Sequence, residues 1–448
     1  MIKRGFFLTV TIVLLAGCTS RSALENALNQ AGSNRSELET VLKHYRTTDA
    51  NPQKLYAAEY LIENMPGHYS YAGNQIYEYY DYAARIFADK SLTPEQQRDS
   101  LLAITDLKYR DLPNHTVPDA QVIKADFLIN SIDKSYNQWT TCPWASQVTF
   151  DEYLEWMLPY KGIELQELDG WRDTLLAYFG KGLEHPIVND VECNTTMGVA
   201  DMIRNDAYNV LNRHGLYTRQ GLPLLSAYLQ VHQTYGDIPD YALTAVLAMR
   251  SAGIPAVLDE TPVGSRGTAA TKWFVIISDR REHLTSEWDL STMIGGGFFP
   301  YERGPKVYRN SYAINKEREE YKKNAKYLYP FDLGKMDVTS QYFLTSNIQL
   351  PVDKSVRNLL KDKYVYIASA VRNEDNPWQI VDFGVIRNGK ACFHDMGREV
   401  LYSVMGFDGE KLVPISDPFI LHKDEQIEYL NADTINAISL DRWKNNAL

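Results

Sequence analysis

The chain has 448 residues, and its 46 basic and 57 acidic side chains give a formal net charge of −11 at neutral pH. This acidic balance argues against an extended nucleic-acid-binding surface, which would need an excess of lysine and arginine. Hydrophobic residues make up 44% of the chain and charged residues 23%, proportions typical of folded globular proteins. The length predicts two to four domains, and four cysteines are too few for a scaffold built on disulfides.

The first residues have the pattern of a bacterial lipoprotein signal. Lys3 and Arg4 precede an apolar run that is too short to span a bilayer. The run ends in the letters LAGC, which resemble the lipobox, the motif in which a lipid such as palmitate is attached to the cysteine. We therefore expect residues 1–17 to be a signal peptide and Cys18 to be lipidated. Removing the two basic residues takes the net charge from −11 to −13.

The same features predict where the protein is found. No later segment reaches the ~18 apolar residues of a transmembrane helix, so we expect attachment to the outer membrane of the cell envelope by lipid alone. Residues 19–22 lack the acidic cluster that resembles a surface-export signal in some Gram-negative lipoproteins. This favours the periplasmic face, with surface exposure left open. The acidic mature chain is not expected to bind nucleic acid or anionic lipid by charge.

Residues 18–215 are predicted to form a helical domain. Capping boxes predict helix starts at Ser36–Glu39, Thr93–Gln96 and Thr149–Glu152. Between the last two, apolar residues recur at spacings of 3, 4, 3, 4 and 3, the periodicity of one face of a long helix: Val122, Ala125, Ile129, Ile132, Tyr136 and Trp139. No fixed-period repeat is present, which favours an irregular helical domain over a solenoid.

Residues 216–335 are predicted to be a core of one helix followed by strands. The helix runs from Asp240 to Ala252 and ends at Gly253, because the following Ile-Pro pair cannot continue it. Short apolar runs predict strands at 256–258 and 273–277.

Residues 336–432 are predicted to form a β-sandwich, and residues 433–448 a polar tail. Alternating runs predict strands at 364–371 and 378–386, and the Asn-Gly and Asp-Gly pairs that follow predict hairpin turns. Short strands at this spacing are typical of a small sandwich. The whole chain is therefore predicted to be a multidomain α+β protein.

The predicted core carries a resemblance to a known family. Residues 236–243 (GDIPDYAL) and 248–256 (AMRSAGIPA) resemble the transglutaminase-like superfamily, which implies a papain-like α+β core. Over nearly its whole mature length the chain resembles transglutaminase-like lipoproteins of Gram-negative gut anaerobes. Further matching stretches are residues 34–39, 64–69, 142–145, 157–160, 306–309 and 395–397.

The resemblance implies a Cys-His-Asp triad for acyl transfer, with the cysteine at a helix N-terminus where the dipole stabilises its thiolate. In this chain the cysteine position falls on Ile238. The histidine position, two residues before Trp273, falls on Thr271. The third position falls on Asp289, next to Trp288. Isoleucine has no nucleophile and threonine is no base near neutral pH, so the resemblance implies a site without catalytic activity.

Two acids flank the start of the predicted helix. Asp237 and Asp240 suit a helix cap, but they would raise the pKa of a thiol and oppose its ionisation. We therefore expect these acids, with Trp273 and Trp288, to line a cleft that binds a ligand. The predicted function is a lipid-anchored binding or accessory module whose ligand is a peptide, peptidoglycan or a glycan.

The alternative is an active cysteine-type amidase, protease or acyltransferase with a nucleophile at another position. Cys142 and Cys392 are expected to pack as small residues. Cys193 could approach His214 or His232, but no spacing in the sequence places them together. The histidines and cysteines show no metal-ligand spacing, so no metal and no cofactor are expected.

A third function class is a structural envelope protein that binds partners through the aromatic residues of its β region. The candidates are Tyr364, Tyr366, Trp378 and Phe383. The simpler interpretation is that they fill the core of the sheet, and this is the one we favour.

Overall fold

The computed structural model describes residues 23–183, 187–188, 191–192, 195–211, 222–233, 238–264, 267, 270–277, 283–284, 303–372 and 377–430. Contacts divide the chain into two compact units: unit 1 contains residues 1–257 and 274–284, and unit 2 contains residues 258–273 and 285–448. The chain passes between the units inside strands β5 (Ala256–Thr261) and β6 (Thr271–Ile277). The predicted domain boundaries after residues 215 and 335 stay predictions.

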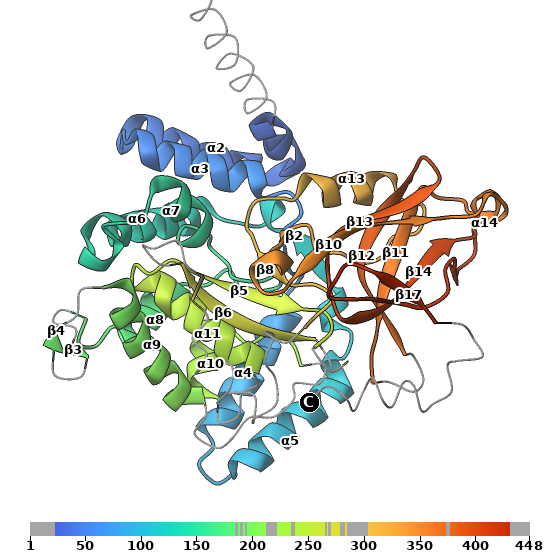
Figure 1. Cartoon of the computed structure of the whole chain (residues 1–448). Coiled ribbons are helices and arrows are strands. Elements are labelled where there is room, and N and C mark those ends of the chain that lie inside the picture. The colour runs from blue at the N-terminus through green and yellow to red at the C-terminus, as the bar shows by residue number, and fades with distance from the viewer. Residues whose placement is uncertain are drawn as a thin grey trace, which may run out of the picture. The chain divides into compact units, whose positions relative to one another are not determined.

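Unit 1 is mainly helical (Figure 1). Its helices are α2 (Arg35–Lys43), α3 (Pro52–Asn64), α4 (Gln75–Ala88), α5 (Pro94–Ile104), α6 (Ala125–Thr141), α7 (Phe150–Trp156), α8 (Trp171–Phe179), α9 (Thr196–Leu211), α10 (Ala227–His232) and α11 (Ile238–Ser251). Short helical turns are η1 (Gly32–Asn34), η2 (His44–Thr48), η3 (Thr105–Tyr109), η4 (Leu112–Asn114), η5 (Asp119–Gln121) and η6 (Pro143–Ala145). The antiparallel strand pairs are β1 (Tyr69–Tyr71) with β2 (Thr116–Pro118), β3 (Ile187–Val188) with β4 (Val191–Glu192), and the end of β6 with β7 (His283–Leu284).

Two of the three predicted capping boxes are confirmed. In Thr93–Gln96 and Thr149–Glu152, each threonine accepts a hydrogen bond from the backbone three residues on, and that residue's side chain reaches back to the threonine N–H. The predicted box at Ser36 is wrong. Helix α2 follows directly on η1, and the side chain of its N-cap residue, Asn34, instead donates to two backbone carbonyls near η5, at 3.0 and 2.8 Å.

Helix α6 is confirmed, but its buried face is rotated from the predicted one. The buried positions are Ala125, Leu128, Ser131, Ile132 and Ser135. The two serines are buried because their hydroxyl groups have partners: Arg172 Nε donates to Ser131 Oγ at 3.2 Å, and Ser135 Oγ lies 3.1 Å from the Tyr153 hydroxyl. A search for apolar periodicity cannot detect such positions.

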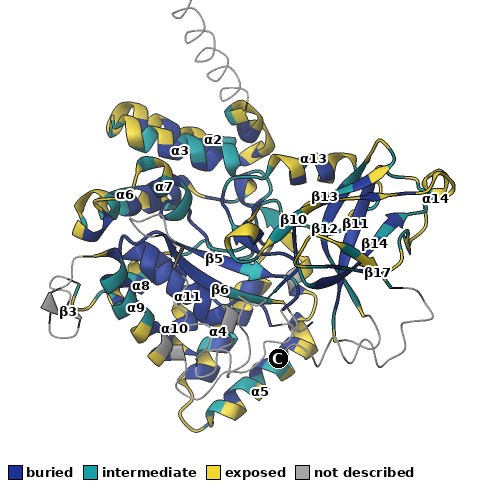
Figure 2. Cartoon of the chain, viewed as in Figure 1, coloured by how far each residue is buried: buried dark blue, intermediate teal, exposed yellow. Residues whose placement is uncertain are grey.

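Helix α11 lies in the core of unit 1. Residues 240–254 are all buried, and Figure 2 shows the helix in dark blue. The predicted end is confirmed, because Gly253 has φ +84°, the left-handed conformation that favours glycine. A Cβ at this position would also lie 3.1 Å from Cys142 Sγ. The buried Arg250 guanidinium donates to the carbonyls of Ala256 and Lys161 at 2.8 and 3.1 Å, which ties the helix to the segments around it.

Unit 2 contains most of the β structure. Its part of β5 pairs antiparallel with β8 (Tyr308–Asn310), and β8 pairs antiparallel with β9 (Lys335–Asp337). The remaining strands are β10 (Thr345–Pro351), β11 (Tyr364–Ala370), β12 (Trp378–Arg387), β13 (Lys390–Gly397), β14 (Val400–Phe407), β15 (Leu412–Pro414), β16 (Phe419–Leu421) and β17 (Ile427–Tyr429). The helical segments are α13 (Lys316–Asn324), η7 (Thr339–Gln341) and α14 (Lys354–Leu359).

The C-terminal strands form one curled antiparallel sheet and not the two stacked sheets of the predicted sandwich (Figure 1). The strand order is β10-β13-β12-β11-β14-β16-β17, and β15 also pairs with β14. The predicted strands and hairpin turn are confirmed: Asn388 and Gly389 have φ of 50° and 78°, as a tight primed turn requires. Strand spacing alone does not say which distant strands pair, so the sandwich could not be distinguished from a single curled sheet.

The aromatic residues of the sheet mostly fill its core. Tyr364, Tyr366 and Phe383 are buried against Tyr321 of α13, with Phe383 stacked on the Tyr321 ring at 4.4 Å between centroids. Trp378 is half-buried. The burial of these three aromatic residues supports the interpretation that they fill the core of the sheet and do not form a contact surface.

Candidate functional site

Helix α11, on which the resemblance would place the nucleophile, begins at Ile238, the residue predicted for the cysteine position. Asp240 follows in the first turn and is only 1% exposed. The helix dipole stabilises a carboxylate there, and the same carboxylate would raise the pKa of a neighbouring thiol. The start of α11 therefore lacks a nucleophile and carries an acid that opposes one.

The other predicted site residues lie in unit 2 or outside the described residues. Thr271 is the first residue of β6 and is half-buried. Trp273, two residues later, is 4% exposed. Outside the description lie Cys18, Asp237, Trp288, Asp289 and the side chain of Ile238. The convergence of the triad-equivalent positions on one cleft therefore stays a prediction.

Trp273 belongs to a buried chain of polar contacts in unit 2. Its indole N–H donates to the Tyr342 hydroxyl at 3.1 Å, which donates to Asp259 Oδ2 at 2.6 Å. Arg309 binds both oxygens of Asp259, at 2.9 and 2.8 Å. Asp259 and Arg309 are 0% and 1% exposed, so the pair is shielded from water and its geometry is fixed by mutual contacts. These contacts give Trp273 a structural role.

The described cysteines have no features of a nucleophile. The Cys142 thiol donates to Gln138 Oε1 at 2.8 Å, and burial raises the pKa of this thiol to about 11. It is therefore protonated at neutral pH. Cys392 on β13 contacts the Lys390 carbonyl at 3.6 Å. Cys193 and His214 lie outside the described residues, and His232 Nδ1 lies 2.7 Å from the Tyr228 carbonyl oxygen.

A buried ionic centre that the sequence did not predict lies in unit 1. His68 is 3% exposed, and its Nδ1 lies 2.6 Å from Glu164 Oε1. Glu164 Oε2 accepts from the Tyr69 backbone N–H at 2.8 Å and lies 3.7 Å from Lys161 Nζ. Burial alone would raise the pKa of Glu164, but Lys161 and His68 outweigh it and lower this pKa to about 2. Lys161 is paired in turn with the fully buried Asp119 at 2.5 Å.

Glu164→Gln is expected to lower the free energy of unfolding by about 1–2 kcal/mol at pH 5.5, because His68 and Lys161 lose a charged partner. The loss is modest because water partly screens the Glu164 carboxylate. The folded pKa of Glu164 is depressed, so its contribution is present above about pH 4.5 and is lost as the pH falls toward 2. Urea unfolding between pH 5.5 and pH 2.5 should show this loss in the free energy of unfolding of wild type and not in that of the variant. Glu78→Gln, which breaks an exposed ion pair with Lys108, is the matched control and should keep the wild-type slope. A Glu164 variant with an unchanged slope would contradict the expectation.

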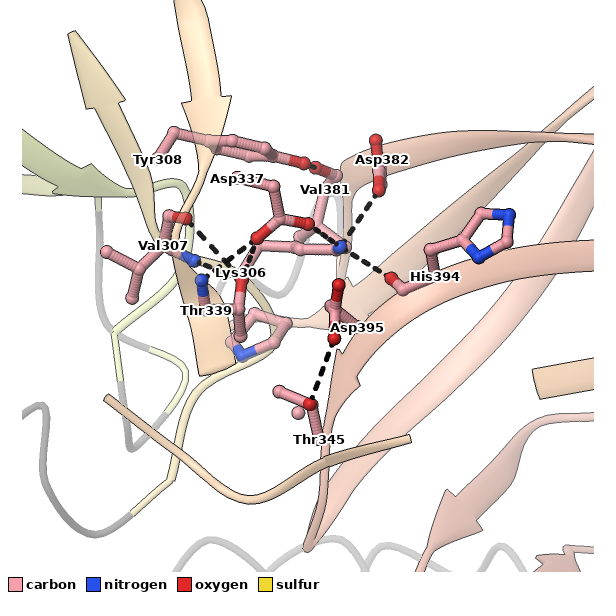
Figure 3. Close-up of polar contacts among 12 residues, drawn as sticks. Lys306, Val307, Tyr308, Asp337, Thr339, Thr345, Val381, Asp382, His394 and Asp395 are labelled. Carbon is pink, nitrogen blue, oxygen red and sulfur yellow. Dashed lines mark hydrogen bonds and ion pairs between the residues drawn. The ribbon is translucent and has the colours of Figure 1, made fainter. Parts of the chain in front are cut away.

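A second buried ionic centre lies in unit 2 (Figure 3). Lys306 is 0% exposed, and its ammonium group is bonded to Asp337, to Asp382 at 3.1 Å and to the His394 carbonyl at 2.7 Å. These acceptors match its three N–H donors. Asp337 Oδ1 also accepts from the Thr339 backbone N–H at 2.9 Å. The lysine thereby links β9, β12 and β13, and this role is structural.

A polar groove of about 590 Å³ lies in unit 1 between α6 and α8. Helix α6 contributes Asp126, Asn130, Lys134 and Asn137, and α8 contributes Asp173 on the other wall. Lys134 and Asp173 form an ion pair that joins the two walls. The groove has the room and the exposed polar groups to hold a ligand.

An unusual carboxyl group lies beside the groove. Asp169 lines a small hollow that shares Asn130, Lys134 and Asp173 with the groove. Burial and, to a smaller extent, the nearby Glu167 together raise the pKa of Asp169 to about 7. Its carboxylate accepts backbone N–H groups from the first residues of α8 and α10, at 3.2 and 3.3 Å. This carboxyl group therefore titrates near neutral pH at the point where two helices begin.

Sequence reasoning missed these sites because their partners are far apart in the chain. The signal that could have indicated the groove is a polar spacing of 4, 4 and 3 on α6, on the face away from the apolar repeat.

Within the described parts of the chain, no three histidine, cysteine, aspartate or glutamate side chains are grouped to hold a metal ion. None of the described helices has the length and apolar character of a membrane span. Comparisons with protein-family models, with curated proteins and with solved structures find no match to this chain.

Proposed function

We propose that the chain is a lipid-anchored protein of the cell envelope with a degenerate transglutaminase-like domain, which binds a ligand without converting it. The observation that carries this proposal is the start of α11. Ile238 opens the helix where the family would place its thiolate, and the buried Asp240 occupies the first turn. A helix N-terminus that already interacts with a carboxylate is a poor environment for a thiolate, which would need the same positive end of the dipole.

The contacts of Cys142 weaken the case for an active cysteine enzyme. Its thiol is hydrogen-bonded to Gln138, and its pKa of about 11 keeps it protonated at neutral pH. A nucleophilic cysteine needs the opposite, a lowered pKa and an adjacent base. The polar groove between α6 and α8 gives a binding function a place that does not depend on the triad-equivalent positions.

At pH 7.5, Cys142 is expected to react with iodoacetamide about 100-fold more slowly than an ordinary thiol, because only the thiolate is alkylated. The test uses the wild-type mature chain, and peptide mass spectrometry reads the time courses of Cys142, Cys193 and Cys392 separately. The same digest should show the lipid on Cys18. The matched variant keeps Cys392 and changes Cys142 and Cys193 to alanine. Rapid alkylation of one cysteine, with loss of an amidase activity, would establish the enzyme alternative instead.

A further inference from the structure

The α6 wall of the groove presents a ladder of polar side chains. Asp126, Asn130, Lys134 and Asn137 are spaced by four, four and three residues, which places them on one side of the helix. At 1.5 Å per residue the ladder is about 16 Å long. Asp126, Asn130 and Asn137 are exposed, so the ladder can contact a chain-like ligand of several units.

The charges around the groove are largely compensated. Lys134 is paired with Asp173 on the other wall, and Asp133 accepts from Lys54 Nζ at 2.9 Å. The Arg172 guanidinium is turned inward and donates to three consecutive backbone carbonyls, at 2.7, 2.8 and 3.1 Å. With the exposed Asp126 included, the acids Asp126, Asp133 and Asp173 are balanced by the cations Lys54, Lys134 and Arg172. A groove with balanced charges offers little net attraction to an acidic or a basic ligand. It therefore favours a ligand that is polar and uncharged.

The groups that remain match the surface of a sugar. The side-chain amides of Asn130 and Asn137 each offer donors and an acceptor, as hydroxyl groups require. A carboxylate held by a lysine, such as that of Asp173, keeps lone pairs for a further hydroxyl donor. Between these polar groups lie the half-buried side chains of Ile129 and Leu176, which can pack against the apolar C–H face of a sugar ring.

We infer that the groove between α6 and α8 binds a neutral oligosaccharide. The inference rests on the proposed function, since it names the ligand class of a chain that binds without turnover. The polar ladder would follow the sugar chain, and the two asparagines would supply its central hydrogen bonds. Losing a hydrogen-bond partner in a desolvated contact leaves the other group unsatisfied, so both asparagines should matter for affinity.

The test is fluorescence polarisation with the full mature protein in detergent. The probes are fluorescein-labelled chitotetraose, cellotetraose and maltotetraose, together with a labelled neutral pentapeptide. At least one tetrasaccharide is expected to bind with a Kd below about 1 mM. The double variant Asn130→Ala, Asn137→Ala should raise that Kd at least tenfold. Asn205→Ala, at an exposed asparagine of α9, is the matched control and should leave it unchanged.

A second variant, Asn130→Trp, fills the groove from an exposed position and should abolish binding while the thermal unfolding midpoint stays unchanged. Three results would overturn the inference: no tetrasaccharide binds, the double variant binds as wild type does, or only the pentapeptide binds. In each case the proposed function would stand if another ligand is bound without turnover. Hydrolysis of a bound probe, read by mass spectrometry, would instead overturn the proposed function and leave the groove as the binding site.

Discussion

Replacing Lys306 by alanine is expected to lower the free energy of unfolding of unit 2 by about 3–5 kcal/mol. The lysine is 0% exposed and is the cation to which both Asp337 and Asp382 are bonded. The side chains of these acids are 29% and 16% exposed, so without the lysine two partly buried carboxylates lose their common cation. Urea unfolding of the full chain gives the free energy, and faster hydrogen exchange in β9, β12 and β13 would locate the loss.

The control separates the loss of charge pairing from the loss of packing. Lys306→Met combined with Asp337→Asn and Asp382→Asn removes all three charges together and should recover most of the lost stability. Lys363→Ala removes an exposed lysine that lies 3.9 Å from Glu320, and it should change the free energy by less than about 0.5 kcal/mol. Equal effects of Lys306→Ala and Lys363→Ala would show that the buried centre does not stabilise unit 2.

The parts of the fold that were predicted from the sequence depend on local chemistry. Thr93 and Thr149 cap helices because their hydroxyls accept from a backbone N–H only three residues away. Gly253 ends α11, and the Asn388-Gly389 pair turns a hairpin, because these residues adopt positive φ at low cost. Such signals involve neighbours in the chain and can be read without knowing the fold.

Long-range pairing could not be predicted in the same way. Strand β14 pairs with β11, β15 and β16, and alternation of apolar residues gives the faces of each strand but not its neighbours. The rotation of α6 has a similar origin, because Ser131 and Ser135 are buried through contacts with Arg172 and Tyr153. A serine does not count as apolar, so its burial depends on a partner that the local pattern does not contain.

The candidate site shows the same limit. The stretches that carry the family resemblance include His68, Lys306 and the carbonyls of residues 157–159, and each of these makes a buried polar contact in the structure. Their partners, among them Glu164, Asp382 and Arg172, lie outside the matching stretches. The sequence therefore drew attention to these residues, but it could not show the buried polar contacts that they make.

Asp169→Asn is expected to stabilise the protein at pH 8 by about 3–4 kcal/mol relative to wild type and to change it little at pH 4. Burial and Glu167 raise the pKa of Asp169 to about 7, so in the folded state the neutral acid is favoured. A raised pKa makes a contribution that is fully present below the unfolded value of about 4 and is lost as the pH rises through 7. Asparagine keeps a neutral acceptor for the N–H groups of Trp171 and Ala227 without this dependence.

The measurement is urea unfolding of wild type and variant at half-unit steps from pH 4 to pH 8. Asp173→Asn, at an exposed position of α8, is the control. It should keep the wild-type dependence of the free energy of unfolding on pH between pH 4 and pH 7. A variant at position 169 with the wild-type slope would show that another group titrates there, and Glu167 would be the next to test because burial also raises its pKa.

The predicted slope means that wild type is less stable at neutral pH than the same fold with a neutral side chain. A charge that weakens the fold beside a polar groove is typical of a functional site, so Asp169 connects the stability of unit 1 to the groove where we place the ligand.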